Sequence, residues 1–529
     1  MRCERNDMVL RPPAAPFRHP RSRRAPHGFA RLGLRALVLG VTVSAWCQAA
    51  PAEGAGAQAH RSSRPPPMPQ KRAADEQDSP IKGATLTLAD AVFLGLRDNR
   101  AIRSAYIDRI AQKFDLRVAE DRFSPQLGVS GSAVRQSIGA IGTSTVQVSP
   151  GASILLPTGA TLGFAWNTSF TDVAGTQTRR STADVTISQP LLRGGGTEVT
   201  MAPLGIARLT ERINRLNLKR TVSNTIGQVI LAYRSLLQAQ ESWQLAQNSL
   251  KRARELVDVN RSLIQAGRMA AVEIVQSEAN VENQQIRVLA AARSIEIARL
   301  NLLQLLSIDL GTAVIAGEST SPERLRPDLR NVMRIALSER PDFLGQLCVV
   351  EQNRLGLTVA ENQKLWDLSV FASGSFGGRT VTSAAAKDSQ RIADGVIGVQ
   401  FNMPLTGLQR EQPAVQASTA LRTSELQLAA IRQGVELQVR SAVTDIEMSW
   451  SQLEVARKAR TLAERALAIE NEKLRAGRSS AFQIRALEAD LRDAEQQQLN
   501  SAIAYLNALT TLDMALGTTL KTWHIDLAD

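Results

Sequence analysis

The chain has 529 residues, a formal net charge of +13 and only 4% aromatic residues. So few aromatic side chains argue against one large globular core, and long stretches rich in Ala, Leu, Gln, Arg and Glu are typical of coiled coils. The positive charge would suit nucleic acid, but +7 of it lies in residues 1–50, and no basic run with interleaved aromatic residues follows. We therefore expect no nucleic-acid partner.

Residues 1–50 have the three parts of a secretory signal peptide, which predicts export from a bacterial cytoplasm. An arginine-rich region ends at Arg35, an apolar run follows over 36–46, and small residues come next. That run is too short to cross a bilayer as a helix. Cys47 stands where a lipoprotein carries its acylated cysteine, although Trp46 before it fits poorly. Acylation of Cys47 and its loss with the leader both stay open.

Residues 51–83 are predicted to be a linker, because their proline run at 64–69 favours polyproline II and the surrounding Ala, Gly and Gln have little to pack. Beyond it, Cys348 is the only cysteine, and no histidine occurs before His524. A Ser-His-Asp triad, a Cys-His pair or a His/Cys metal site therefore cannot form in the body of the chain. We expect no enzyme, no cofactor and no metal.

The next part, residues 84–312, opens with Thr87 as a predicted N-cap. Apolar residues at helical spacing then predict one helix up to Ser124-Pro125. A strand region rich in Gly, Ser and Thr follows as far as Gln189, with turns expected at 156–159 and 172–180. In it, alternate apolar residues point to one face of a strand; these are Leu162, Phe164 and Trp166.

A long helix is predicted from about 197 to 264, because apolar residues recur every three or four positions along it. At about 1.5 Å per residue it would be about 100 Å long. Gly267 ends it, since glycine adopts the left-handed conformation at little cost, and a second helix returns over about 271–308.

A connector (313–328), a second similar part (329–520) and a short tail (521–529) complete the chain. The second part repeats the order of the first with less strand. Its predicted elements are a helix over 331–364 interrupted at Arg340-Pro341, strands at 368–374 and 397–403, a helix over 411–475, a turn at Gly477 and a returning helix to about Leu516.

The two helical turns have nearly the same sequence. Residues 266–279 align with residues 476–489, and seven of these fourteen positions are identical without a gap. Unrelated sequences would match at about one position. The chain is therefore predicted to be an internal duplication of two repeats, 84–312 and 329–520.

The predicted strands are too few to close a membrane barrel. The first repeat supplies two to four and the second supplies two, whereas a barrel needs at least about eight and lipid does not tolerate an open edge. Three chains would pool 12 or 18 strands, with the long helices forming a tube beside them. The same strand alternation would also fit a periplasmic coiled-coil scaffold or tether without a pore, and that alternative stays open.

Several motifs in this order resemble the TolC-like outer-membrane efflux proteins over residues 84–520. They are Leu86 to Ala91 followed by Asp98-Asn99, Phe123 to Leu127, Gln189 to Gly195 with its echo Met403-Pro404-Leu405, and the two Ala-Gly-Arg turns.

The resemblance implies a mainly α fold with transmembrane β-strands: long helical hairpins forming an α-barrel, and a β-barrel shared within a homotrimer. It also implies a passive channel in the outer-membrane lipid with a periplasmic tunnel. Such a channel serves tripartite efflux or type I secretion, taking cargo from an inner-membrane transporter through a periplasmic adaptor protein. The extra hairpin expected at 153–170 leaves open whether each chain gives four or six strands.

The resemblance also nominates site residues. The tips Gly267, Arg268, Gly477 and Arg478 would contact the adaptor. Glu273 either contributes to a ring of carboxylates at a periplasmic gate or is an ordinary solvated residue in a first helical turn.

The second repeat carries Gln483 where the first has Glu273, which weakens the case for a gate with acidic residues from both repeats. Pro190 and Pro404 are expected to end strands and act as hinges between strand and helix.

Overall fold

The computed structural model describes residues 83–527 apart from 140, 319–321, 405, 406 and 477, and all of them belong to one compact unit, Gln77–Asp529. The signal peptide, Cys47, nearly all of the linker and Gly477 lie outside the described residues. The predictions made for them, and the predicted boundaries of the repeats, stay predictions.

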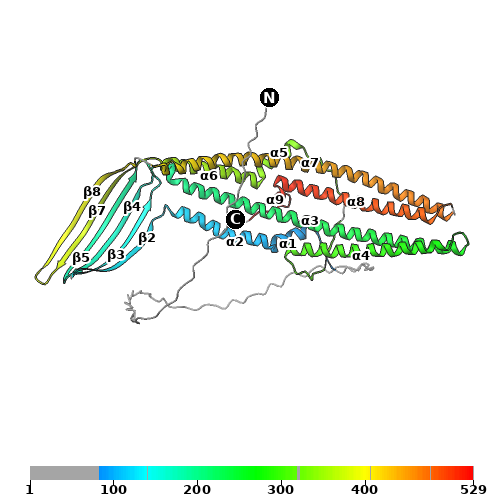
Figure 1. Cartoon of the computed structure of the whole chain (residues 1–529), viewed down its shortest axis with the longest axis horizontal. Coiled ribbons are helices and arrows are strands. Elements are labelled where there is room, and N and C mark those ends of the chain that lie inside the picture. The colour runs from blue at the N-terminus through cyan, green and yellow to red at the C-terminus, as the bar shows by residue number, and fades with distance from the viewer. Residues whose placement is uncertain (1–82, 140, 319–321, 405–406, 477, 528–529) are drawn as a thin grey trace, which may run out of the picture. The chain divides into compact units, whose positions relative to one another are not determined.

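Helices make up most of the described chain (Figure 1). They are α1 (Leu88–Asp98), α2 (Arg100–Asp121), α3 (Thr197–Gln265), α4 (Val272–Leu306), α5 (Leu329–Glu339), α6 (Pro341–Gln363), α7 (Gln412–Arg475), α8 (Ala481–Leu516), α9 (Thr519–Thr522) and a 3-10 turn at Leu408–Arg410. The two long helices, α3 and α7, have 69 and 64 residues, which is about 100 Å each. None of the described helices is both long and apolar enough to cross a bilayer.

The first predicted helix is wrong in one respect, because Asn99 divides it into α1 and α2. The backbone of Asn99 is extended, with ψ 127°, and its side-chain oxygen caps α2 by accepting from the N–H groups of Ala101 and Ile102. Its amide nitrogen also donates to the carbonyl of Leu305, at 2.7 Å. The predicted N-cap at Thr87 is confirmed, since Thr87 and Asp90 form a capping box.

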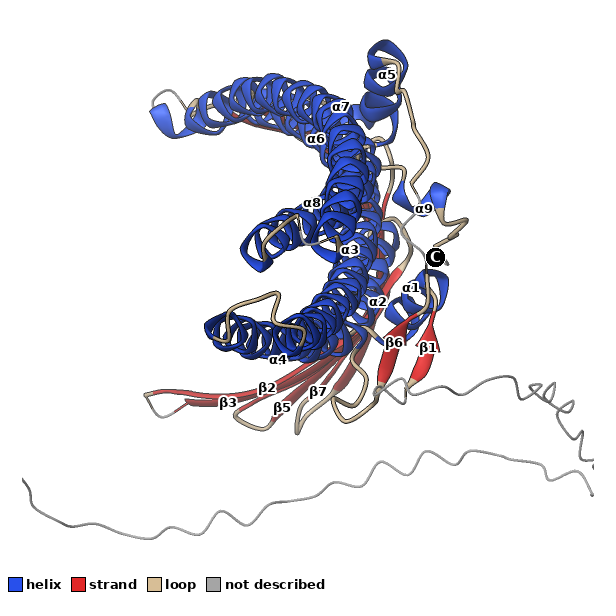
Figure 2. Ribbon diagram, turned by 90° about the vertical axis from the view of Figure 1, so that its right-hand side faces the viewer, coloured by secondary structure: helices blue, strands red, loops and turns tan. Residues whose placement is uncertain are grey.

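The long helices form a layer one helix thick. At the end that joins the sheet, α3 lies between α2 and α6, and α6 contacts α7; towards the hairpin tips, α3 contacts α4 and α8, and α8 contacts α7. Figure 2 shows these helices side by side in a curved layer. The layer therefore ends on one side at α2 and α4 and on the other side at α7.

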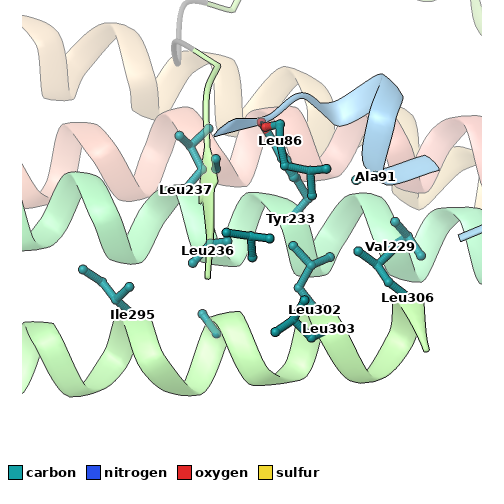
Figure 3. Close-up of a cluster of buried hydrophobic side chains, with 13 residues drawn as sticks. Leu86, Ala91, Val229, Tyr233, Leu236, Leu237, Ile295, Leu302, Leu303 and Leu306 are labelled. Carbon is teal, nitrogen blue, oxygen red and sulfur yellow. The ribbon is translucent and has the colours of Figure 1, made fainter. Parts of the chain in front are cut away.

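A buried cluster ties the middle of α3 and the C-terminal part of α4 to a small parallel sheet of β1 (Ala84–Leu86) and β6 (Val314–Ala316). Tyr233 of α3 is fully buried and points towards Leu86 (Figure 3). Its hydroxyl donates to the Leu86 carbonyl at 2.9 Å and accepts from the Gly317 N–H at 3.2 Å. The segments that flank the helical layer are thus fixed to it by a satisfied buried hydroxyl.

A second antiparallel sheet has the order β2-β3-β4-β5-β7-β8. Its strands are β2 (Gln126–Ile138), β3 (Ile141–Leu155), β4 (Thr161–Val173), β5 (Thr176–Pro190), β7 (Asp367–Thr382) and β8 (Lys387–Asn402). The described chain therefore contributes six strands, four before α3 and two after α6. The sheet thus has the larger of the two strand numbers that the sequence left open, and the part these strands play in a barrel stays a prediction.

Two expectations about these strands are wrong. The turn expected at 172–180 is confined to Ala174-Gly175, so its arginines lie within β5. The strands of the second half are also longer than predicted, because β7 has 16 residues and β8 has 16. Their glycines and charged residues obscure the alternation in the sequence, whereas pairing with β5 holds β7 extended along its length.

Candidate channel wall and hairpin tips

The six-stranded sheet has one apolar face, which we call the outer face. Because side chains alternate along a strand, the residue pairs of the ladder show which side chains share a face. Most of the large apolar side chains of the outer face are exposed in the single chain. They are Leu127, Val129, Val146, Val148, Leu162, Phe164, Trp166, Phe170, Val185, Ile187, Val370, Phe376, Ile397, Val399 and Phe401.

The opposite face, which we call the inner face, is mostly polar, with a few apolar exceptions such as Val134 and Val396. A hollow of about 790 Å³ is lined largely by its residues near the helices. The polar residues of the inner face include Ser130, Ser132, Gln147, Ser149, Asn167, Ser169, Arg180, Thr182, Asp184, Ser373, Ser375, Arg379, Gln390, Asp394 and Gln400. An apolar face backed by a polar one suits a wall between lipid and water.

The apolar band crosses the strands obliquely. In β2 the end of the band that is far from the helices lies at Arg135. The row of ladder partners through Arg135 crosses the sheet to Lys387 in β8. In β8, however, the band ends at Arg391, four residues nearer the helices. Towards the helices it starts at Leu127 in β2 and at Phe401 in β8, a displacement of six residues in the same direction. Over five strand steps this corresponds to a tilt of about 30–40°. Strands of membrane barrels tilt by about 35–45°.

The sheet and the helical layer end on the same two sides of the chain. The outermost strands are β2 and β8, and each has a ladder partner on one side only within the described residues. α2 leads directly into β2, and β8 leads towards α7. One open side therefore consists of β2, α2 and α4, and the other of β8 and α7.

The helices at these open sides carry exposed apolar stripes. The stripe of α7 repeats first every 11 and then every 7 residues, which keeps its members on one side of the helix; it comprises Val415, Leu426, Leu437, Met448, Val455, Leu462 and Ile469. The stripe of α2 comprises Ile107, Ile110, Phe114 and Val118, and that of α4 comprises Val272, Val275, Ile286, Leu289 and Ile297. Exposed apolar side chains aligned along one side of a helix in this way are typical of a surface that packs against another chain.

The predicted hairpin turn at Gly267 is confirmed as a left-handed helix cap. Gly267 has φ +71°, its N–H donates to the carbonyl of Ile264, and the N–H of Arg268 donates to the carbonyl of Leu263. At the other tip, the N–H of Arg478 donates to the carbonyl of Lys473. The side chains of Arg268 and Arg478 are both exposed.

The two tips lie together, which the sequence did not predict. Arg485 of α8 donates to the side-chain oxygen of Gln276 of α4 at 2.6 Å, and Met269 packs against a buried cluster between the hairpins. That cluster comprises Leu256, Leu467, Leu474, Ile484 and Leu491. Exposed arginines from both tips are thereby presented at the same end of the layer.

Glu273 is half-buried in the first turn of α4. Among the described residues its carboxylate forms no ion pair, while its backbone carbonyl accepts from the Ser277 hydroxyl at 3.1 Å. The corresponding Gln483 accepts from the hydroxyl of Ser479 at 3.3 Å. A gate role for Glu273 stays a prediction that involves further copies of the chain.

The two predicted hinge prolines lie where strands meet helices. Pro190 is the last residue of β5 and pairs with Ser369, and Pro404 follows the end of β8. Between β5 and α3 the loop is tied to the second half of the chain by an ion pair of Arg193 with Asp367, at 2.5 Å. Bending at either proline stays a prediction.

Sequence reasoning missed a polar contact surface between the two hairpins. Arg234 of α3 donates to the carbonyl of Leu506 and, at 2.7 Å, to the Thr510 hydroxyl of α8, and burial lowers the pKa of Arg234 to about 10. Further along, Arg252 pairs with Glu495 at 3.2 Å. Polar residues within the segments that form α3 and α8 were the only available signal, because the partners are more than 240 residues apart in the chain.

The comparisons with known proteins agree with this geometry. A family model for outer membrane efflux proteins matches residues 94–307. The chain is related to the outer membrane efflux proteins. The resemblance noted in the sequence is thus confirmed. No curated protein sequence matches the chain.

Solved structures show the same fold. The CmeC outer membrane channel of Campylobacter jejuni is 16% identical, with a TM-score of 0.60 over 83% of this chain and 90% of that one. VceC of Vibrio cholerae is 15% identical, with a TM-score of 0.61 over 81% and 96%. The MtrE outer membrane channel of Neisseria gonorrhoeae, in its open state, is 18% identical, with a TM-score of 0.61 over 81% and 88%. At these identities the likeness establishes the fold.

Proposed function

We propose that this chain is the subunit of an outer-membrane channel that serves as the passive exit duct of a tripartite efflux or type I secretion system. The proposal rests on the six-stranded sheet, whose outer face is apolar and exposed and whose inner face is mostly polar. The ends of its apolar band also run obliquely across the strands. A soluble protein would cover so large an apolar face. Lipid covers it at no cost.

Closure of the wall requires further copies of the chain. Six strands are fewer than the roughly eight that a barrel needs, and unpaired edges are not tolerated in lipid. Three copies joined β8 to β2 would give 18 strands. At about 4.8 Å between strands and a tilt near 35°, such a barrel would be about 35 Å across between backbones. A lumen of this width holds water.

The same three copies would close the helical layer. When β8 of one copy pairs with β2 of the next, the α7 stripe of the first copy comes to lie against α2 and α4 of the second. Both helical surfaces at the junction between the copies are then apolar. The helices would then enclose a tunnel about 100 Å long that extends the barrel into the periplasm. Cargo would enter at the hairpin tips from a periplasmic adaptor and an inner-membrane transporter.

Fractionation and conductance test this function. We expect the mature protein to co-purify with the outer membrane, to migrate as a detergent-resistant trimer and to conduct ions in a planar bilayer. A coiled-coil scaffold would instead be released without detergent. A water-soluble monomer that gives no conductance would contradict the channel function.

Reversing the charge at both tips tests the adaptor contact. We expect Arg268→Glu with Arg478→Glu to weaken adaptor binding by about tenfold, because both arginines are exposed at one end of the layer and charges set complementarity at an interface. The measurement is adaptor affinity of the purified trimer, together with export. Arg354→Glu, at an exposed ion-paired position in α6, is the matched control. Unchanged adaptor affinity in the tip variant would remove both arginines from the interface.

A further inference from the structure

Two arginines face each other on the inner face of the sheet. Arg180 in β5 is the direct ladder partner of Arg379 in β7, and both side chains are exposed. Directly opposed side chains have Cβ atoms about 5 Å apart, and like charges in that position destabilise a sheet. Their other cross-strand partners are the neutral residues Ser169 in β4 and Gln390 in β8. The pair is therefore a concentrated positive charge.

Asp184 interacts electrostatically with Arg180 across the inner face but does not form an ion pair with it. No ion pair within the described residues includes Arg180 or Arg379. Asp184 lies four residues along β5, where its carboxylate accepts from the hydroxyls of Ser375, at 2.5 Å, and Thr182, and from the amide of Asn167. Asp388 is diagonal to Arg379 across the β7–β8 ladder and does not form an ion pair with it.

The adjacent Arg179 has a different environment. It lies on the outer face, where its guanidinium stacks over the ring of Phe170 at 5.2 Å from the centroid. Arg179 thus has a partner within the chain, whereas Arg180 and Arg379 present their donors to the space in front of the inner face. Consecutive residues of one strand therefore give a test residue and a control residue of the same type.

We propose that Arg180 and Arg379 form an anion-binding pair, taking phosphate or carboxylate groups, that makes the outer part of the lumen selective for anions. Two planar guanidinium groups side by side match the oxygens of such anions, and a bound anion offsets the repulsion between them. The proposal rests on the channel function. Three copies would place six guanidinium groups at one level of the barrel, the arrangement that favours anions in pores.

Reversal potentials under a KCl gradient test the pair. For Arg180→Gln with Arg379→Gln we expect the chloride-to-potassium permeability ratio to fall by about fivefold at low salt. The difference should shrink in concentrated salt, because the Debye length falls from about 30 Å at 0.01 M to about 3 Å at 1 M. Inorganic phosphate should reduce the chloride current of the wild type and have little effect on that of the double variant.

Two further variants make the result specific. Arg179→Gln should leave the chloride-to-potassium permeability ratio unchanged. Arg180→Lys with Arg379→Lys should keep most of the wild-type anion selectivity, since the positive charge is kept. A conducting double variant with the wild-type ratio, or an equal loss in Arg179→Gln, would overturn the pair while leaving the channel function intact. A wild type that does not conduct would overturn both.

Discussion

Replacing Ile397 with arginine is expected to abolish assembly in the outer membrane. Ile397 is 84% exposed, in the middle of the apolar band of β8. On a water-soluble sheet such a position would accept arginine readily. On a sheet that faces lipid, an arginine at the bilayer midplane costs about 2–4 kcal/mol, and a trimer contains three such arginines. The measurement is the amount of heat-sensitive trimer in isolated outer membranes.

The matched control for Ile397 is Gln400→Arg in the same strand. Gln400 is also exposed but belongs to the inner face, so its arginine would point into water and assembly should stay at the wild-type level. Equal assembly of both variants would show that the outer face does not contact lipid. Equal loss in both would mean that β8 tolerates no new charge on either face.

A second large effect is expected at the α7 stripe. Glutamates in place of Leu426 and Leu437 should prevent trimer formation while leaving the hairpins folded. Leu437 is 70% exposed in the single chain, so the fold of one copy does not depend on it. Burial of a leucine against α2 or α4 of the next copy would contribute about 1.5–3 kcal/mol, and a buried unpaired carboxylate would oppose association further.

Analytical ultracentrifugation in detergent measures this effect, with helix content followed by circular dichroism. Methionines at the same two positions are the control, because they keep the apolar volume and should keep the trimer. A glutamate variant that stays trimeric would place the α7 stripe outside the interface. A glutamate variant that loses its helices would show instead that the stripe supports the fold of one chain.

Much of the helical part could be predicted because its signals are local. Gly267 ends a helix in the left-handed conformation and Thr87 caps the start of another, as the sequence indicated. The seam of α3 was also readable, since Val222, Ile226 and Tyr233 are buried. Each of these features depends on residues within one or two turns of the chain.

The candidate site could be predicted only in part. The sequence indicated that Leu162, Phe164 and Trp166 share a face, but it placed Arg179 and Arg180 in a turn. The extended conformation of these arginines depends on the ladders of β5 with β4 and β7, and β7 lies about 200 residues away in the chain. Local glycine and charge content cannot report such pairing.

The sequence by itself determined the helical hairpins, the alternation within single strands and the similarity of the two tips, because periodicity and capping are properties of short segments. Only the tertiary structure decided that six strands form one sheet, that the apolar band runs obliquely across it, and that Arg180 meets Arg379. The physical reason is that register joins residues far apart in the chain. A shift of one residue in any ladder would exchange the two faces of a strand.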